Sequence, residues 1–326
     1  MKLPVGSAAA YLLVASVLAA PAHESPRVKL TVIAEDSAGK PVTDLDAADF
    51  TVRDNGLRQK IVSLRRNQSH GPRPVVILFD LLNSSFDSRG AVLNMMKTAL
   101  RRLPSGDPLY LYLLVEDGSL YAVHGLAGDQ AAGAGSGGWP RDAESALDDA
   151  MRKANQVKPQ DFRAASPIAL PSRFDATCKA LEDMRTRMDE LPGSKALLWV
   201  TYGFPSQIRM AGQGWWDGGP LLRQVGSRFL ESRISIYTAD PGTNPERGML
   251  NRDALDTLAG ATGGRTFSTI DINQARDRIE ADARGSYTIE YEPSQGWDGK
   301  YHKLRVTVAR KGVRLQTERG YFGAVL

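Results

Sequence analysis

One aspartate of this chain, Asp80, stands where an open α/β sheet would place a ligand site. It follows the apolar residues 75–79 and precedes a polar turn that contains Asn83, Ser84 and Ser85. An apolar run bounded by turn residues predicts a strand buried on both faces, as in a parallel sheet. Such sheets bind ligands at the carboxyl ends of their strands. Asp80 is therefore a candidate functional residue; in the alternative interpretation it caps the next helix with Ser84 and Ser85.

The other candidates lie in loops that are expected to gather at the same sheet edge. These loops are residues 81–89, 202–220 and 239–250. Trp215 and Trp216 stand within a glycine-rich stretch of the second loop, and Asp240 lies near the start of the third. Because exposed tryptophans anchor contacts with other molecules, Trp215, Trp216 and Asp240 are candidate ligand-binding residues. Alternatively, both tryptophans fold back over the sheet edge as a lid.

The sequence lacks the residue spacings that are typical of catalytic sites. Its four histidines are scattered, and it contains neither Gly-x-Ser-x-Gly nor a Walker lysine motif. The single cysteine, Cys178, excludes an intrachain disulfide and a metal site built on cysteines. It falls in a helical apolar pattern and is expected to be a small buried side chain. We assign no catalytic residue and expect that the chain is not an enzyme.

Composition and charge indicate a globular protein with a substantial core. Of the 326 residues, 42% are hydrophobic and 24% are charged. The formal net charge is +4, but no long basic run carries interleaved aromatic residues. Nucleic acid is therefore not an expected partner.

The N-terminus has the pattern of a secretory signal. Lys2 precedes an apolar stretch at residues 8–18, and Ala20-Pro21-Ala22 fits a small-residue cleavage site. Residues 1–22 are therefore a predicted signal peptide, and the mature chain would start at His23 and be secreted or periplasmic. Alternatively, the segment stays as an uncleaved anchor. No later segment approaches the roughly 18 apolar residues that a span needs, so we expect no membrane span in the mature chain.

Three segments differ in periodicity. Strand and helix patterns alternate through residues 71–285, which predicts an α/β unit with a mostly parallel central sheet flanked by helices. Residues 23–70 and 286–326 read as short strands with period two. Neither terminal segment is large enough to be a domain, so we expect them to pair as a β-sandwich into which the α/β unit is inserted. Residues 59–64 are expected to form one returning strand, and residues 203–219 a long loop.

Four short motifs occur in order along the chain. They are Leu45-x-x-x-Asp49-Phe50-Thr51-Val52-x-Asp54-x-Gly56, Val76-x-Leu78-x-Asp80-x-x-Asn83-Ser84, Leu191-Pro192-Gly193-x-Lys195-Ala196-Leu197-x-Trp199 and Gly320-Tyr321-Phe322. Over nearly the whole mature chain they resemble the secreted bacterial family of VWFA-related acidobacterial domain proteins. The resemblance implies a Rossmann-like domain similar to the von Willebrand factor type A (VWA) domain. In that superfamily the domain binds proteins, and many members use a metal-ion-dependent adhesion site that begins Asp-x-Ser-x-Ser.

The chain departs from this metal-site pattern. By the resemblance, Asp80 matches the aspartate and Ser84 the second serine, whereas Leu82 at the first serine position offers no oxygen. The triplet Thr201-Tyr202-Gly203 replaces Thr-Asp-Gly, and Mg²⁺ requires about six oxygen ligands. The resemblance thus implies a degenerate Mg²⁺ site. Its candidate ligands are Asp80, Asn83 and Ser84, with Ser85 or Asp240 as further donors.

Three functions remain open at this point. The first is a secreted or periplasmic module that holds another protein at the loop edge, with the β-sandwich as scaffold. The second is a structural protein of the cell envelope without a site at that edge. The third is a metal-dependent hydrolase that uses Asp80 and Asp240. Because metal ligands are missing from the pattern, the sequence favours the first two.

Overall fold

A computed structural model describes most of the chain. The described residues are 27–67, 73–84, 86–101, 109–127, 129, 143–156, 169–204, 206–210, 214–240, 245–267, 271–294 and 298–323. The predicted signal peptide at residues 1–22 and the side chain of Ser85 lie outside them. Among the described residues, no helix is both long and apolar enough to cross a membrane.

The centre of the α/β unit is a six-stranded sheet with the order β12-β11-β8-β5-β6-β7. The strands are β5 (Val75–Asp80), β6 (Leu109–Leu114), β7 (Leu120–His124), β8 (Lys195–Val200), β11 (Ile234–Ala239) and β12 (Thr266–Phe267). All neighbours run parallel except β7, which pairs antiparallel with β6. The mostly parallel sheet predicted from the sequence is therefore confirmed.

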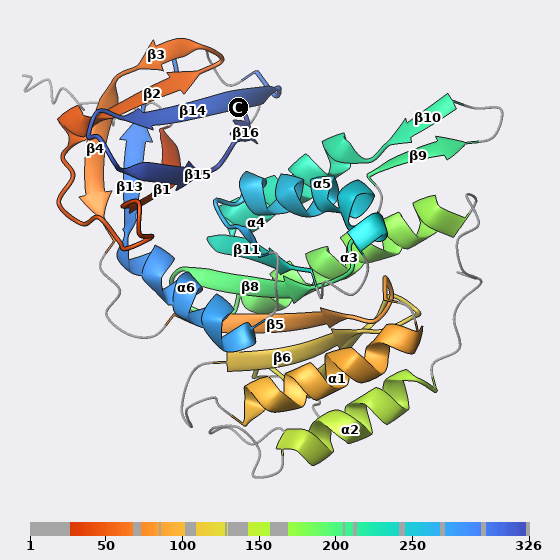
Figure 1. The fold of residues 1–326 in the computed structure, drawn as a ribbon. Coiled ribbons are helices and arrows are strands. Elements are labelled where there is room, and N and C mark those ends of the chain that lie inside the picture. Colours follow the sequence, from red (N-terminus) through yellow and green to blue (C-terminus); the bar gives the residue numbers. More distant parts are fainter. Residues whose placement is uncertain are drawn as a thin grey trace, which may run out of the picture.

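Helices cover both faces of this sheet (Figure 1). They are α1 (Phe86–Leu100), α2 (Ala143–Ala154), α3 (Ala169–Met188), α4 (Gly219–Glu231), α5 (Pro245–Ala261) and α6 (Ile272–Arg284). Ile77 and Phe79 of β5 share a core with α1, α2 and α6, whereas Val76 and Leu78 share one with α3, α4 and α5. Because successive strand residues point to opposite faces, residues 75–79 of β5 must all be apolar, and all six side chains of the strand are buried, including Asp80 at its end.

A second unit, which we call the sandwich, contains two antiparallel four-stranded sheets. Its strands are β1 (Val28–Glu35), β2 (Phe50–Asp54), β3 (Leu57–Gln59), β4 (Ile61–Arg66), β13 (Ser286–Tyr291), β14 (Tyr301–Val308), β15 (Arg314–Thr317) and β16 (Gly320–Phe322). The sheet orders are β15-β1-β13-β4 and β16-β14-β2-β3, so each sheet combines strands from both chain ends. Leu30, Val52 and Tyr287 are among the side chains buried between them.

The expected single strand over residues 59–64 is wrong. Within it, β3 pairs with β2 and β4 pairs with β13, so the chain passes from one sheet to the other at Lys60. The buried side chain of Gln59 holds this corner, because its Nε2 donates to Ser294 Oγ (2.9 Å) and its Oε1 accepts from Ser294 N (3.0 Å). No glycine or proline marks the corner between residues 57 and 64, which conceals it in the sequence.

Charged side chains join the sandwich to the α/β unit. Arg265 contacts Asp282 of α6 through Nε (2.7 Å) and Nη2 (2.8 Å), and its Nη2 also donates to Glu35 at the end of β1 (2.9 Å). Arg278 pairs with the same two carboxylates. We call Glu35, Arg265, Arg278 and Asp282 the junction cluster. Asp282 is only 1% exposed, so the two arginines supply the charge that its burial requires.

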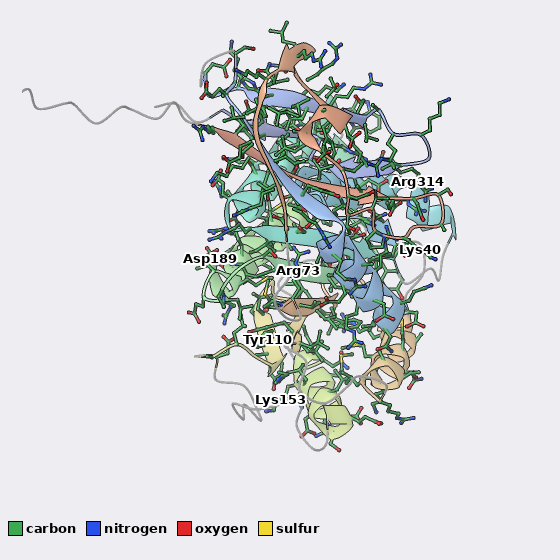
Figure 2. All side chains as sticks on the ribbon, turned by 90° about the vertical axis from the view of Figure 1, so that its left-hand side faces the viewer. Lys40, Arg73, Tyr110, Lys153, Asp189 and Arg314 are labelled. Atoms are coloured by element: carbon green, nitrogen blue, oxygen red, sulfur yellow. The ribbon has the colours of Figure 1, made fainter. Side chains whose placement is uncertain are left out.

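Further contacts close the same junction. Arg314 of β15 lies beside the turn that carries Lys40 (Figure 2), and its Nη2 is 3.4 Å from Glu35 Oε1. The side chain of Gln316 donates to the carbonyl of Gly264, immediately before β12. The contact of Arg314 with Glu35 is within the sandwich, whereas Glu35 on β1 and Gln316 on β15 attach the sandwich to the α/β unit.

A buried polar cluster holds the interior of the sandwich. Asp54 Oδ1 is 2.9 Å from His302 Nδ1, and its Oδ2 accepts hydrogen bonds from the hydroxyls of Tyr291 (2.9 Å) and Tyr321 (2.8 Å). His302 Nε2 lies 3.1 Å from Asp298. Burial on its own lowers the pKa of His302, but the hydrogen bonds to the two aspartates outweigh it, so that the pKa is raised.

We expect replacement of His302 with glutamine to lower the free energy of unfolding by about 2–3 kcal/mol, because buried Asp54 loses a charged partner. Because the pKa of His302 is raised on folding, the stabilisation is fully present below the unfolded pKa of roughly 6.5 and is lost as pH rises through the pKa of the folded chain. Urea unfolding at several pH values checks both points. An unchanged pH profile in His302→Gln would contradict the assignment of a charged imidazole.

Candidate functional site

Three polar residues form a row at the carboxyl edge of the parallel sheet. Phe79 pairs with Val200, which pairs with Ala239, so Asp80, Thr201 and Asp240 follow at the same level on adjacent strands. Because neighbouring strands lie about 4.8 Å apart, the Cα atoms of Asp80 and Asp240 are separated by roughly 10 Å. The fold thus brings Asp80 next to Thr201 and places Asp240 one strand further along the edge.

Hydrogen-bond donors surround the Asp80 carboxylate. Its Oδ1 accepts the backbone N–H of Asn83 (2.9 Å), and its Oδ2 accepts the Asn83 side-chain amide and the Thr201 hydroxyl (both 2.7 Å). Thr201 Oγ1 in turn accepts the N–H of Gly203 (3.0 Å). The carboxylate therefore ties the turn after β5 to the end of β8.

A third element joins this network. Asn83 Nδ2 also donates to Thr177 Oγ1 on α3 (3.0 Å), and the Thr177 hydroxyl donates to the carbonyl of Arg173 (2.8 Å). Burial raises the pKa of Asp80 above its usual value of 3.8, while the hydrogen bonds from Asn83 and Thr201 oppose the rise. A buried carboxylate with neutral donors is costly in its charged form, so these donors are what make its burial tolerable.

The residues at this edge do not supply the ligand set of a hard cation. Three of the four lone-pair positions of Asp80 already accept hydrogen bonds, and Asn83 presents donors rather than its oxygen. Ser84 donates its hydroxyl to the carbonyl of Leu81 (3.0 Å), and buried Leu82 offers no oxygen. The described residues also include no cluster of three or more His, Cys, Asp or Glu side chains that could hold a metal ion. Mg²⁺ needs about six oxygens, so these residues do not fit it.

The stretch expected to be a long loop, residues 203–219, contains a hairpin instead. Strands β9 (Gln207–Met210) and β10 (Gly214–Asp217) pair antiparallel and extend from the edge of the α/β unit (Figure 1). Gly214 has φ +84°, a conformation that favours glycine where the chain enters β10. The base is closed where Gly218 N donates to Ser206 O (2.7 Å). Each strand has only four residues, and apolar and polar residues do not alternate regularly in β10, so the sequence shows no clear period-two pattern here.

The two tryptophans of β10 have different environments. Trp216 packs edge-on against Phe174 of α3, with ring centroids 4.7 Å apart, and Phe174 contacts Phe204 (5.1 Å). A Cβ at Gly218 would overlap the rings of Phe174 and Trp216, so this packing requires glycine there. Trp215 is 70% exposed. The lid interpretation thus describes Trp216, whereas Trp215 presents its indole to solvent.

Two partners of this edge could not be predicted from the sequence. Thr177 and Phe174 lie on α3, about 100 residues after Asp80, and nothing in their local pattern points to Asn83 or Trp216. A threonine and an aromatic residue one turn apart on an amphipathic helix are common, so only the tertiary arrangement reveals them. Asp240 is held to the neighbouring strand by its backbone, whose N–H donates to Phe267 O (3.3 Å).

These features define the chain as a mixed α/β protein with a mostly parallel sheet and further antiparallel sheets. No family model and no curated protein matches the chain. Among solved structures it is similar to the human COPII-coat protein Sec24c (TM-score 0.30, 10% identity, 78% of this chain) and to a mutant of the PilB minor pilin from Streptococcus sanguinis (TM-score 0.36, 10% identity, 66% of this chain). The matched parts span 44% and 61% of the lengths of those two chains, and both likenesses are distant.

Proposed function

We propose that the chain is a VWA-like binding module that acts in the periplasm or outside the cell and holds another protein at the β9–β10 hairpin. The observation that carries this proposal is Trp215, a large aromatic side chain that is 70% exposed on a short projecting strand. Tryptophan is among the residue types most enriched at energetically dominant interface positions. The module does not require a cation at Asp80, because hydrogen bonds already occupy that carboxylate.

The packing of Trp216 on the α/β unit supports this role. Trp216 is fixed on Phe174, and Phe174 and Phe204 connect it to Trp199 inside the sheet, where the ring centroids of Trp199 and Phe204 are 5.7 Å apart. An anchor whose backbone is already ordered loses less conformational entropy on binding. Trp215 is thus a solvent-facing side chain on a prearranged support, and a short exposed hairpin offers backbone groups to a partner strand.

Replacing Trp215 with alanine is expected to weaken partner binding by at least about 30-fold, the effect of losing a dominant interface residue. The thermal midpoint should stay unchanged, because most of the indole surface is in solvent. Val62→Ala is the matched control, since Val62 is also an exposed apolar residue (41%) but lies on β4 of the sandwich. Partners captured from envelope extract by the wild-type chain are identified, purified and titrated against each variant by surface plasmon resonance.

The same titration separates the alternatives. Binding that survives Trp215→Ala but is lost in Trp216→Ala would move the contact away from the indole and contradict the proposal. Binding that disappears with EDTA and returns with Mg²⁺ would restore a metal-dependent site. If neither the wild-type chain nor any variant captures a partner, the result would favour the alternative that the chain is a structural protein of the cell envelope.

A further inference from the structure

Three arginines line up across the outer face of the sandwich. Arg305 on β14 pairs directly with Arg53 on β2, and Arg53 pairs with Arg58 on β3. All three are exposed, and their strand neighbours Val52, Asp54 and Leu304 are buried, so the arginines point away from the sandwich core. Side chains directly opposite on adjacent strands are separated by only about 5 Å at Cβ.

Within the described part of the chain, no acidic side chain pairs with this row. Lys303 lies two residues from Arg305 and thus on the same face, and none of these four cations has an acidic partner among the described residues. The acid of these strands, Asp54, points inward to His302. Like charges placed directly opposite destabilise a sheet. A row of this kind is therefore costly for the free protein and is relieved by an anionic surface.

A shallow cleft adjoins the row. It has a volume of about 430 Å³ and lies between the short helix η1 (Ala47–Asp49) and the corner of β3 and β4. Its apolar lining includes Phe50 and Ile61, whereas Arg58 and Lys60 contribute positive charge. Apolar side chains next to two cations are suited to bind an amphiphile that has an apolar part and an anionic group.

We propose that this face docks on an anionic phospholipid surface. The outer face of a sheet presents its cations as an array rather than a groove, and guanidinium groups bind phosphate oxygens in bidentate fashion. Arg58 connects this array to the cleft, because it belongs to the row and also lines the cleft. The cleft accepts the apolar part of a lipid next to Arg58 and Lys60.

The same observations favour a lipid surface over other polyanions. Single-stranded nucleic acids require aromatic side chains on which bases stack. The outward residues Thr51, Arg53, Arg58, Lys303, Arg305 and Thr307 include none. Tyr301 lies farther along the same face of β14, but its ring packs against Phe322 and lies under the guanidinium of Arg223 from α4. An acidic polypeptide would satisfy the charges but leaves the apolar lining of the cleft unused. The face lies at the end of the molecule opposite α2, where no described element covers it (Figure 1).

The test is co-sedimentation of the full chain with phosphatidylcholine vesicles, with and without phosphatidylglycerol. We expect binding only with phosphatidylglycerol and a steep loss at high salt. Replacing Arg53 and Arg305 together with glutamine should weaken it by about 30-fold, from the contribution of two cations near an anionic surface. The matched control, Arg152→Gln with Lys153→Gln, removes the same charge from α2 at the far end and should bind as the wild type does (Figure 2).

A second measurement guards against misfolding. Because Arg53→Gln with Arg305→Gln relieves like-charge contacts, its thermal midpoint should rise by about 1–3 °C rather than fall. Equal binding to neutral vesicles, or full binding by this variant, would overturn the proposal. So would tighter binding to a DNA oligonucleotide or to polyglutamate than to the anionic vesicles.

Discussion

Replacing Asp80 with alanine is expected to lower the free energy of unfolding by about 3–4 kcal/mol. Asp80 is 3% exposed, and its removal leaves three donors without an acceptor: the backbone and side-chain amides of Asn83 and the hydroxyl of Thr201. It also cuts the connection between the turn after β5, the end of β8 and α3. The loss is measured by urea unfolding, and added Mg²⁺ should not change it in either protein.

Asp80→Asn provides the control and the pH test. Burial raises the pKa of Asp80 in the folded chain. The stability that this shift provides is therefore fully present when pH is below the unfolded pKa near 3.8, and it is lost as pH rises through the folded pKa. Glu318, whose pKa burial raises to about 7, acts with the same sign, so the informative quantity is the difference between wild type and Asp80→Asn. That difference should change with pH above about 4. A constant difference, or stabilisation of the wild type alone by Mg²⁺, would contradict our description of this carboxylate.

The second large effect is expected at the junction cluster. Replacing Asp282 with alanine should cost about 3–5 kcal/mol, because Arg265 and Arg278 stay partly buried without the carboxylate that pairs with both. Since Glu35 then holds both cations alone, the sandwich and the α/β unit should become less strongly coupled.

Asp277→Ala is the matched control, since Asp277 lies on the same helix but its side chain is 73% exposed. It should stay within about 0.5 kcal/mol of the wild type. In Asp282→Ala, fluorescence and circular dichroism should report two separate urea transitions where the wild type shows one. A single transition with unchanged midpoint would show that the junction is held by other contacts.

The sequence predicted those parts of the fold that repeat a local pattern. The apolar run that ends at Asp80 has no polar position, and it is a strand covered by helices on both faces. Alternation in residues 286–291 likewise predicted β13. In both segments the buried positions require apolar side chains, so the order of apolar and polar residues is enough to predict a strand.

Contacts between distant segments left no such signal. Asp54 and His302 are 248 positions apart, and each fits an ordinary strand on its own. The partners of Asn83 and Trp216 on α3 were invisible for the same reason. The hairpin β9–β10 was missed because its glycines favour loops locally, whereas packing of Trp216 on Phe174 stabilises strands there. The role of Asp80 thus depended on donors that only the folded chain brings together.

The pairing of β4 with β13 has a mechanical consequence. The chain leaves the sandwich after β4 and returns at β13, and these neighbours are directly hydrogen-bonded from Ile61↔Tyr291 to Arg66↔Tyr287. Tension applied through residues 27 and 323 is therefore transmitted through the sandwich ladders, while the intervening α/β unit stays outside the load path. If the molecule is tethered and pulled by shear flow, the hairpin that carries Trp215 should stay folded until the hydrogen bonds between β4 and β13 break.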